Sequence, residues 1–183
     1  MTTTRAAGFG PRRVVIAAVV LAGLVVAAVV LTRSSGSSSS PTTAGRVAPA
    51  VSAVDVRDGR PPVDLTAIRA GRPAVVNFFA AWCEPCRQEL PALARASAAH
   101  PGVAFVGVDY QDSKSNAVDI LDRYGVGYPA AYDPEGGIGA TYGIRGLPAT
   151  AFVDARGRIT AMHLGALSAS ELERRLSRLV PAG

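Results

Sequence analysis

The sequence predicts an α/β domain, in which helices cover both faces of a β-sheet, preceded by one transmembrane helix. Three observations predict this. Strand-like and helical patterns alternate between residues 51 and 183. The only two cysteines, Cys83 and Cys86, lie three positions apart between a strand-like run and a helical one, and residues 14–31 contain no polar side chain.

The apolar run from Val14 to Leu31 is long enough to cross a bilayer. As a helix it would span about 27 Å, close to the hydrocarbon thickness. Basic residues precede it and acidic ones do not; they are Arg5, Arg12 and Arg13. The positive-inside rule therefore predicts a cytoplasmic N-terminus and an extracytoplasmic domain held at the cell membrane.

A cleaved signal peptide is the alternative interpretation, with cleavage after Ala28. We prefer a retained anchor, because the run is longer than a usual signal-peptide core and contains no A-x-A site. The expected organisation is residues 1–13 in the cytoplasm, 14–32 as the anchor, 33–50 as a flexible linker rich in Ser, Thr, Gly and Pro, and 51–183 as the domain.

The charge of the chain gives no support for nucleic-acid binding. Four of the 19 basic residues precede residue 46, which leaves 15 basic against 14 acidic residues in the remainder, or +1. The high isoelectric point, about 9.8, therefore comes from the N-terminal region.

The first half of the domain begins with a hairpin pattern, in which Asp58-Gly59 separates the apolar runs 51–56 and 63–65. Uninterrupted apolar runs at 74–79 and 103–108 predict buried strands, and the patterns of 83–99 and 114–124 predict helices, the second with Val118 and Leu121 inward.

The second half is expected to add a short strand, a short helix and a strand, at 128–132, 138–142 and 150–153. A turn at 154–157 then leads to a strand at 159–164. The last helix begins with Ser168 and Glu171, which fit a capping box, and its apolar stripe contains Leu172, Leu176 and Leu179.

The cysteine pair indicates redox chemistry. At a helix N-terminus, unpaired backbone N–H groups and the helix dipole favour the thiolate of Cys83, which we predict to be the nucleophile. Cys86, one turn further, would resolve the mixed disulfide by forming the Cys83–Cys86 disulfide. Pro85 is compatible with a first turn, where its missing N–H costs nothing.

Other uses of the pair are less favoured. A structural disulfide across two residues closes too small a loop to stabilise much. A zinc site needs two more ligands, and the histidines, His100 and His163, are distant in sequence. Haem attachment requires His where Arg87 stands. The sequence predicts neither a metal nor a cofactor.

Two glutamates flank the cysteines. Glu84 is an anion beside Cys83 that would disfavour the thiolate and so favour a reductant, although it is also an ordinary first-turn residue. Glu89 lies three residues after Cys86 on the same side of the helix, where a carboxyl group could exchange a proton with Cys86. A solvated surface charge is the alternative for Glu89.

Four segments in one order, covering residues from about 50 to 180, resemble the thioredoxin fold, and specifically the membrane-anchored family of ResA, TlpA and CcmG (DsbE). The segments are Asn77 to Pro91, Gly107 to Asp112, Tyr142 to Asp154, and His163 to Gly165. The resemblance assigns residues 113–142 to the helix and strand that this family inserts into thioredoxin.

The resemblance also implies site residues. It places an active-site glutamate at Glu89 and a cis-proline at Leu147-Pro148, which would face the cysteines and pair with a substrate chain. Trp82 would form the other wall, with simple burial as the alternative.

The function implied is an extracytoplasmic thiol-disulfide oxidoreductase that keeps the haem-binding thiols of apocytochrome c reduced, and that receives electrons from a CcdA-like or DsbD-like membrane partner. A disulfide-forming oxidant is the alternative within the same chemistry. A metal-handling or haem-handling binding protein and a thiol peroxidase are the alternatives from other classes.

Overall fold

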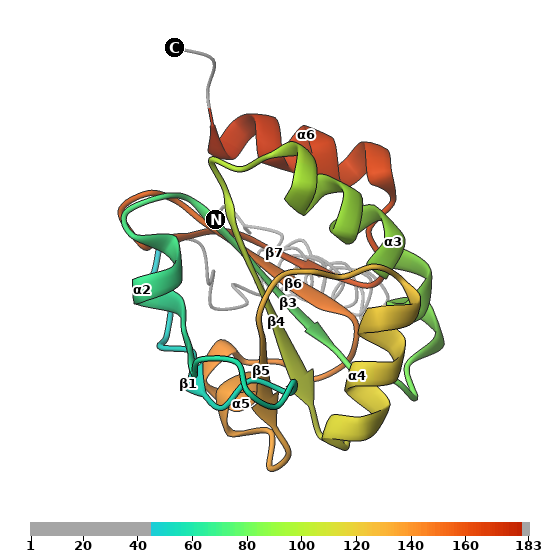
Figure 1. The fold of residues 1–183 in the computed structure, drawn as a ribbon. Helices are drawn as coiled ribbons and strands as arrows, with labels where there is room; N and C mark the ends of the chain where they lie inside the picture. Colours follow the sequence, from blue (N-terminus) through green and yellow to red (C-terminus); the bar gives the residue numbers. More distant parts are fainter. Residues whose placement is uncertain (1–44, 181–183) are drawn as a thin grey trace, which may run out of the picture. The chain divides into compact units, whose positions relative to one another are not determined.

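The computed structural model describes residues 45–180, and Figure 1 shows their arrangement. The predicted cytoplasmic segment, the transmembrane helix and the linker up to residue 44 lie outside the described residues. Within residues 45–180, no helix combines the length and apolar character needed to cross a membrane.

A mixed five-stranded sheet forms the centre of the domain, with strand order β5-β4-β3-β6-β7. Its strands are β3 (Ala74–Phe79), β4 (Ala104–Tyr110), β5 (Ala130–Asp133), β6 (Ala149–Val153) and β7 (Ile159–Leu164). β3 is parallel to β4 and antiparallel to β6. All six residues of β3 are buried, as expected for a central strand covered on both faces.

Helices cover both faces of the sheet, which confirms the predicted α/β class (Figure 1). The alternating side chains of β3 divide the core in two, with Val75 and Phe79 in one cluster and Val76 and Phe78 in the other. The first cluster contains residues of α3 (Glu84–Ala99), α4 (Lys114–Arg123) and α6 (Ala169–Leu179). The second contains residues of α2 (Leu65–Arg69) and α5 (Gly137–Tyr142).

The predicted elements are present with small shifts of their ends. The N-terminal hairpin reduces to β1 (Ser52–Ala53) paired with β2 (Val63–Asp64). Ser168 caps α6 by accepting a hydrogen bond from the backbone N–H of Glu171, as the capping box predicts. α2 was not predicted, because five residues carry no periodic signal; its local signal is Asp64, whose carboxylate accepts from Thr66 N and Ala67 N.

Two irregular segments lie along the outer strands. Residues 54–56 pair with β5, where Val56 N donates to Ala130 O and Tyr132 N donates to Val54 O. Residues 45–48 pair with the start of β7, where Ala48 N donates to Gly157 O and Ile159 N donates to Arg46 O. Residues 45–50, expected to belong to the linker, are therefore packed on the domain, because the edge of β7 offers backbone partners to them.

Candidate active site

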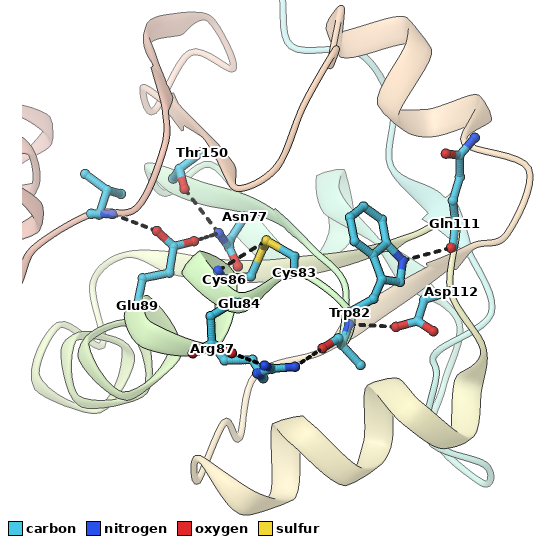
Figure 2. Close-up of a disulfide and its surroundings, with 12 residues drawn as sticks. Asn77, Trp82, Cys83, Glu84, Cys86, Arg87, Glu89, Gln111, Asp112 and Thr150 are labelled. Atoms are coloured by element: carbon cyan, nitrogen blue, oxygen red, sulfur yellow. Dashed lines mark hydrogen bonds and ion pairs between the residues drawn. A yellow bond between two sulfur atoms is a disulfide. The ribbon is translucent and has the colours of Figure 1, made fainter.

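The cysteine pair lies where β3 gives way to α3. β3 ends at Phe79, and Cys83 is the N-cap of α3, so that its sulfur accepts a hydrogen bond from Cys86 N at 3.2 Å. Cys83 and Cys86 form a disulfide (Figure 2), with their Cα atoms 5.3 Å apart. Pro85 lies in the first turn of α3. Cys83 is 5% exposed and Cys86 is fully buried, which leaves Cys83 as the sulfur that a partner reaches first.

Glu89 is buried beside the pair, with only 1% of its surface exposed, so the alternative of a solvated charge is wrong. Its Oε1 accepts from Asn77 Nδ2 at 2.7 Å and its Oε2 accepts from Leu167 N at 2.8 Å. Burial raises the pKa of Glu89 to about 7, although both hydrogen bonds act in the opposite direction. A carboxyl group with this pKa can both give and take a proton near neutral pH.

Asn77 orients Glu89, and the sequence prediction missed this role. Asn77 faces Thr150 across the β3–β6 ladder and donates to its Oγ1 at 3.2 Å as well as to Glu89. A polar residue inside an otherwise apolar strand was the available signal, since a buried amide requires partners.

Glu84 is not an isolated anion. Arg87 forms an ion pair with Glu84 through Nη2 and donates through Nη1 to the carbonyl of Ala81 at 2.7 Å. A guanidinium three residues later on the same helix face therefore offsets the charge of Glu84, and the effect of Glu84 on the Cys83 thiolate stays a prediction.

The segment before Cys83 is held by the loop that follows β4. Asp112 Oδ2 accepts from Ala81 N at 2.6 Å, and the indole of Trp82 donates to Gln111 O at 3.2 Å (Figure 2). Trp82 is 60% exposed, so burial does not explain its presence beside the cysteines. The sequence prediction named neither Gln111 nor Asp112 as a site residue.

The Leu147-Pro148 peptide bond is cis, as the family resemblance implies. The next residue, Ala149, pairs with Phe78, which places this bond at the same end of the sheet as Cys83. Pro148 is buried and its carbonyl accepts from Gly165 N at 2.9 Å, whereas Leu147 is half-buried. The roles of Leu147 and Pro148 toward a substrate chain stay predictions.

A second buried carboxyl group belongs to Asp109, on the strand next to β3. Asp109 is fully buried, and neither of its carboxyl oxygens has a hydrogen-bond partner among the described residues. Burial raises the pKa of Asp109 to about 8, with smaller contributions from Asp112 and Asp133. Asp109 lies opposite Phe79 in the β3–β4 ladder, and Phe79 precedes Cys83 by four residues.

The cysteine pair does not line the largest pocket found among the described residues. This pocket, of about 520 Å³, is lined by Val56, Lys114, Val118 and neighbouring residues, and neither cysteine contributes to it. Across residues 45–180, no three His, Cys, Asp or Glu side chains gather so that they could hold a metal ion. The disulfide makes thiol-disulfide exchange available at Cys83, and the role of Glu89 as a proton carrier stays a prediction.

The model of the family described as Redoxin matches residues 43–176 of this chain. The chain belongs to the Redoxin family. This Redoxin-family chain is 38% identical over 124 residues to the thiol:disulfide interchange protein DsbE of Allochromatium vinosum, a match covering 67% of each chain. It is 33% identical to the thiol:disulfide interchange protein HelX of Rhodobacter capsulatus, over 75% of this chain and 77% of HelX.

Solved structures of disulfide oxidoreductases are similar to this domain in fold and sequence. A secreted disulfide oxidoreductase of Mycobacterium tuberculosis, homologous to E. coli DsbE, has a TM-score of 0.64 at 29% identity, covering 70% of this chain and 96% of that one. A thiol:disulfide interchange protein of Chlorobium tepidum has a TM-score of 0.66 at 30% identity, covering 73% and 95%. This member of the family is a thiol-disulfide oxidoreductase with Cys83 and Cys86 as its CxxC pair.

Proposed function

We propose that this protein is a membrane-tethered, extracytoplasmic reductant of protein disulfides, and that its substrates are the haem-binding cysteines of apocytochrome c. The observation that carries the redox part is the Cys83–Cys86 disulfide with the buried carboxyl group of Glu89 beside it. The similarity to DsbE and HelX supports the substrate, and the apolar run of residues 14–31 supports the tether.

The reaction starts from the reduced pair. The Cys83 thiolate attacks one sulfur of the substrate disulfide, which forms a mixed disulfide and releases the first substrate thiol. Cys86 then loses its proton to Glu89 and attacks the sulfur of Cys83. The mixed disulfide breaks, the second substrate sulfur leaves as a thiolate that takes up a proton from solvent, and the two electrons of the enzyme dithiol have passed to the substrate.

The carboxyl group of Glu89 is suited to the second step. Cys86 is fully buried, so bulk water does not receive its proton directly. Glu89 lies one helical turn away on the same face, and its pKa of about 7 is close to the pH of operation. Re-reduction then requires a dithiol partner, which we infer to be a CcdA-like or DsbD-like membrane protein.

The direction of electron flow is the part of the proposal that an experiment must settle. A reductant should have a potential near that of thioredoxin, about −270 mV, whereas an oxidant should lie near that of DsbA, about −120 mV. Equilibration of the purified protein with glutathione buffers, followed by thiol alkylation, measures this potential.

Trapping identifies the substrate. Cys86→Ser should hold a disulfide-bonded apocytochrome peptide on Cys83, whereas Cys83→Ser, its matched control, should hold almost none. A potential near that of DsbA, together with faster oxidative folding of a reduced protein than reduction of the apocytochrome peptide, would replace the reductant by the oxidant.

A further inference from the structure

Four arginines cluster at the end of the sheet that lies away from the cysteines. They are Arg69, Arg72, Arg156 and Arg158, and we call them the arginine cluster. β3 begins at Ala74, which pairs with Val153, and runs to the cysteine end. Its six residues therefore separate the two ends of the sheet by about 20 Å.

Contacts between the end of α2 and the β6–β7 turn hold the cluster together. Arg69 Nη1 donates to the carbonyls of Asp154 at 3.3 Å and Ala155 at 3.2 Å. Figure 1 shows the β6–β7 turn and the loop after α2 next to each other at the left end of the sheet, with the start of α3 on the other side of the domain.

The positive charges of the cluster are not neutralised by ion pairs. Arg72 donates to the carbonyls of Pro101 and Ile68, and Arg158 donates to that of Gly45, so the partners are neutral. Every ion pair found among residues 45–180 uses other side chains. Asp154 lies in the same turn, where it accepts from the backbone N–H groups of Arg156 and Arg158.

The charge of the domain is therefore distributed unevenly between its two ends. Residues 46–183 carry 15 basic and 14 acidic side chains, so an excess of positive charge at one end requires an excess of negative charge elsewhere. Two acidic residues lie at the cysteine end, Asp112 in the loop after β4 and Asp133 at the end of β5.

The chain enters the domain beside the cluster. Gly45 N donates to Ile159 O at 2.6 Å, and Gly45 O accepts from Arg158 Nη1 at 2.6 Å. Between the end of the proposed membrane helix at Leu31 and Gly45 lie 13 residues. The Ser, Thr, Gly and Pro composition of this stretch predicts a coil, and a coil of that length has an end-to-end distance of about 20 Å, so a retained tether would hold this end of the domain near the bilayer surface.

We propose that the arginine cluster docks on the anionic lipid headgroups of the membrane that anchors the chain, so that the cysteine end points away from the bilayer. Guanidinium groups bind phosphate oxygens with two hydrogen bonds, and basic groups near an anionic surface are attracted to it within about a Debye length. This inference rests on the proposed membrane tether. Its consequence is that Cys83 faces the compartment in which exported substrates arrive.

Trp82 is the only tryptophan, and it lies at the cysteine end, so it reports the orientation of the domain. The full chain, kept oxidised, is placed in nanodiscs whose headgroups carry a dansyl acceptor, made of phosphatidylcholine alone or with phosphatidylglycerol added. Energy transfer from Trp82 to the headgroups should be weaker in the anionic nanodiscs, because docking holds Trp82 away from the surface. Added salt should remove the difference.

Charge reversal tests the cluster itself. Arg156→Glu with Arg158→Glu should abolish the difference between the two lipids, and Arg156→Gln with Arg158→Gln should reduce it, whereas reduction of a soluble disulfide should stay unchanged. The matched control, Arg95→Glu with Arg123→Glu, changes the net charge equally at exposed positions outside the cluster and should keep the difference.

Equal transfer in both lipids from a chain that stays in the nanodiscs would overturn the docking alone, and so would a control that behaves like the cluster variant. A chain that leaves nanodiscs of both compositions would overturn the tether and the docking with it. The measured reduction potential tests the redox function of Cys83 and Cys86 independently of the docking.

Discussion

Replacing Glu89 with Gln should make the oxidised protein more stable at neutral and alkaline pH and slower as an oxidoreductase. The pKa of Glu89 is raised from 4.5 to about 7 by burial. In the unfolded chain the carboxyl group ionises above pH 4.5, whereas in the folded protein it stays protonated until about pH 7. The free energy of unfolding is therefore highest, as far as Glu89 is concerned, below pH 4.5, and it falls as the pH rises from 4.5 to about 7.

The size of this loss follows from the two pKa values. Each pKa unit corresponds to about 1.4 kcal/mol, so the interval from 4.5 to about 7 corresponds to about 3 kcal/mol. Glutamine does not ionise and avoids the loss. The free energy of unfolding of Glu89→Gln, minus that of the native protein, should therefore rise by about 2 to 3 kcal/mol between pH 5 and pH 8.

The surrounding hydrogen bonds can accommodate the amide. Glu89 receives two donors, Asn77 Nδ2 and Leu167 N, and Gln offers only one acceptor oxygen. Asn77 Oδ1 has no partner among the described residues, so rotation of the Asn77 amide presents it to the new NH₂ group. The hydroxyl of Thr150 can then donate to Asn77 instead of accepting from it.

Urea unfolding of both oxidised proteins at pH 5 and pH 8 measures the effect, and reduction of a mixed-disulfide substrate over the same range measures the activity. Asp109 adds its own pH dependence to both proteins and cancels in the difference. If the two unfolding free energies change in parallel between pH 5 and pH 8, Glu89 does not carry the raised pKa and the proton-transfer role fails.

Three further predictions concern the charges around the cysteines. Arg87→Gln should lower the reduction potential by about 10 to 30 mV, because loss of the guanidinium leaves the charge of Glu84 unopposed beside the Cys83 thiolate. Arg87→Lys keeps a positive charge and should have a potential close to that of the native protein, and a glutathione titration measures both potentials. Glu84→Gln should shift the potential upward by a similar amount, and an unchanged potential in both variants would mean that the pair does not influence the thiolate. Asp109→Asn should change the unfolding free energy least at pH 4 and raise it increasingly up to about pH 8, because the carboxyl group ionises above its ordinary pKa of 3.8 in the unfolded chain and stays protonated until about pH 8 in the folded protein; an equal change at pH 4 and pH 8 would contradict this.

The sequence was sufficient for the fold and for the sulfur chemistry because both have local signals. An apolar run locates β3 and a preceding turn locates β7, both with the observed ends, and the spacing of Cys83 and Cys86 identifies the pair before any contact is known. The short helix α2 was missed because it depends on one capping side chain, that of Asp64.

Contacts between distant segments could not be predicted in the same way. Asn77 orients Glu89 across 12 positions, and Asp112 holds Ala81 across 31, so neither pairing has a periodic pattern. The ion pair of Arg87 with Glu84 is local, yet several rotamers of a long side chain are open to it. Its extra bond to Ala81, which requires the turn before α3, selects one of them.

The irregular segments along the outer strands also affect how the protein behaves in a crowded compartment. An uncovered strand edge is a template for pairing with other chains and so a route to aggregation. Residues 54–56 cover β5, and residues 45–48 cover the start of β7. Among the described residues, the outer edge of β7 has no such backbone partner beyond Ile159, and the strand ends at Leu164, which pairs with Ala149 beside the cis-proline. Self-association through this stretch of β7 would therefore take place near the active site, where a bound substrate chain would compete with it.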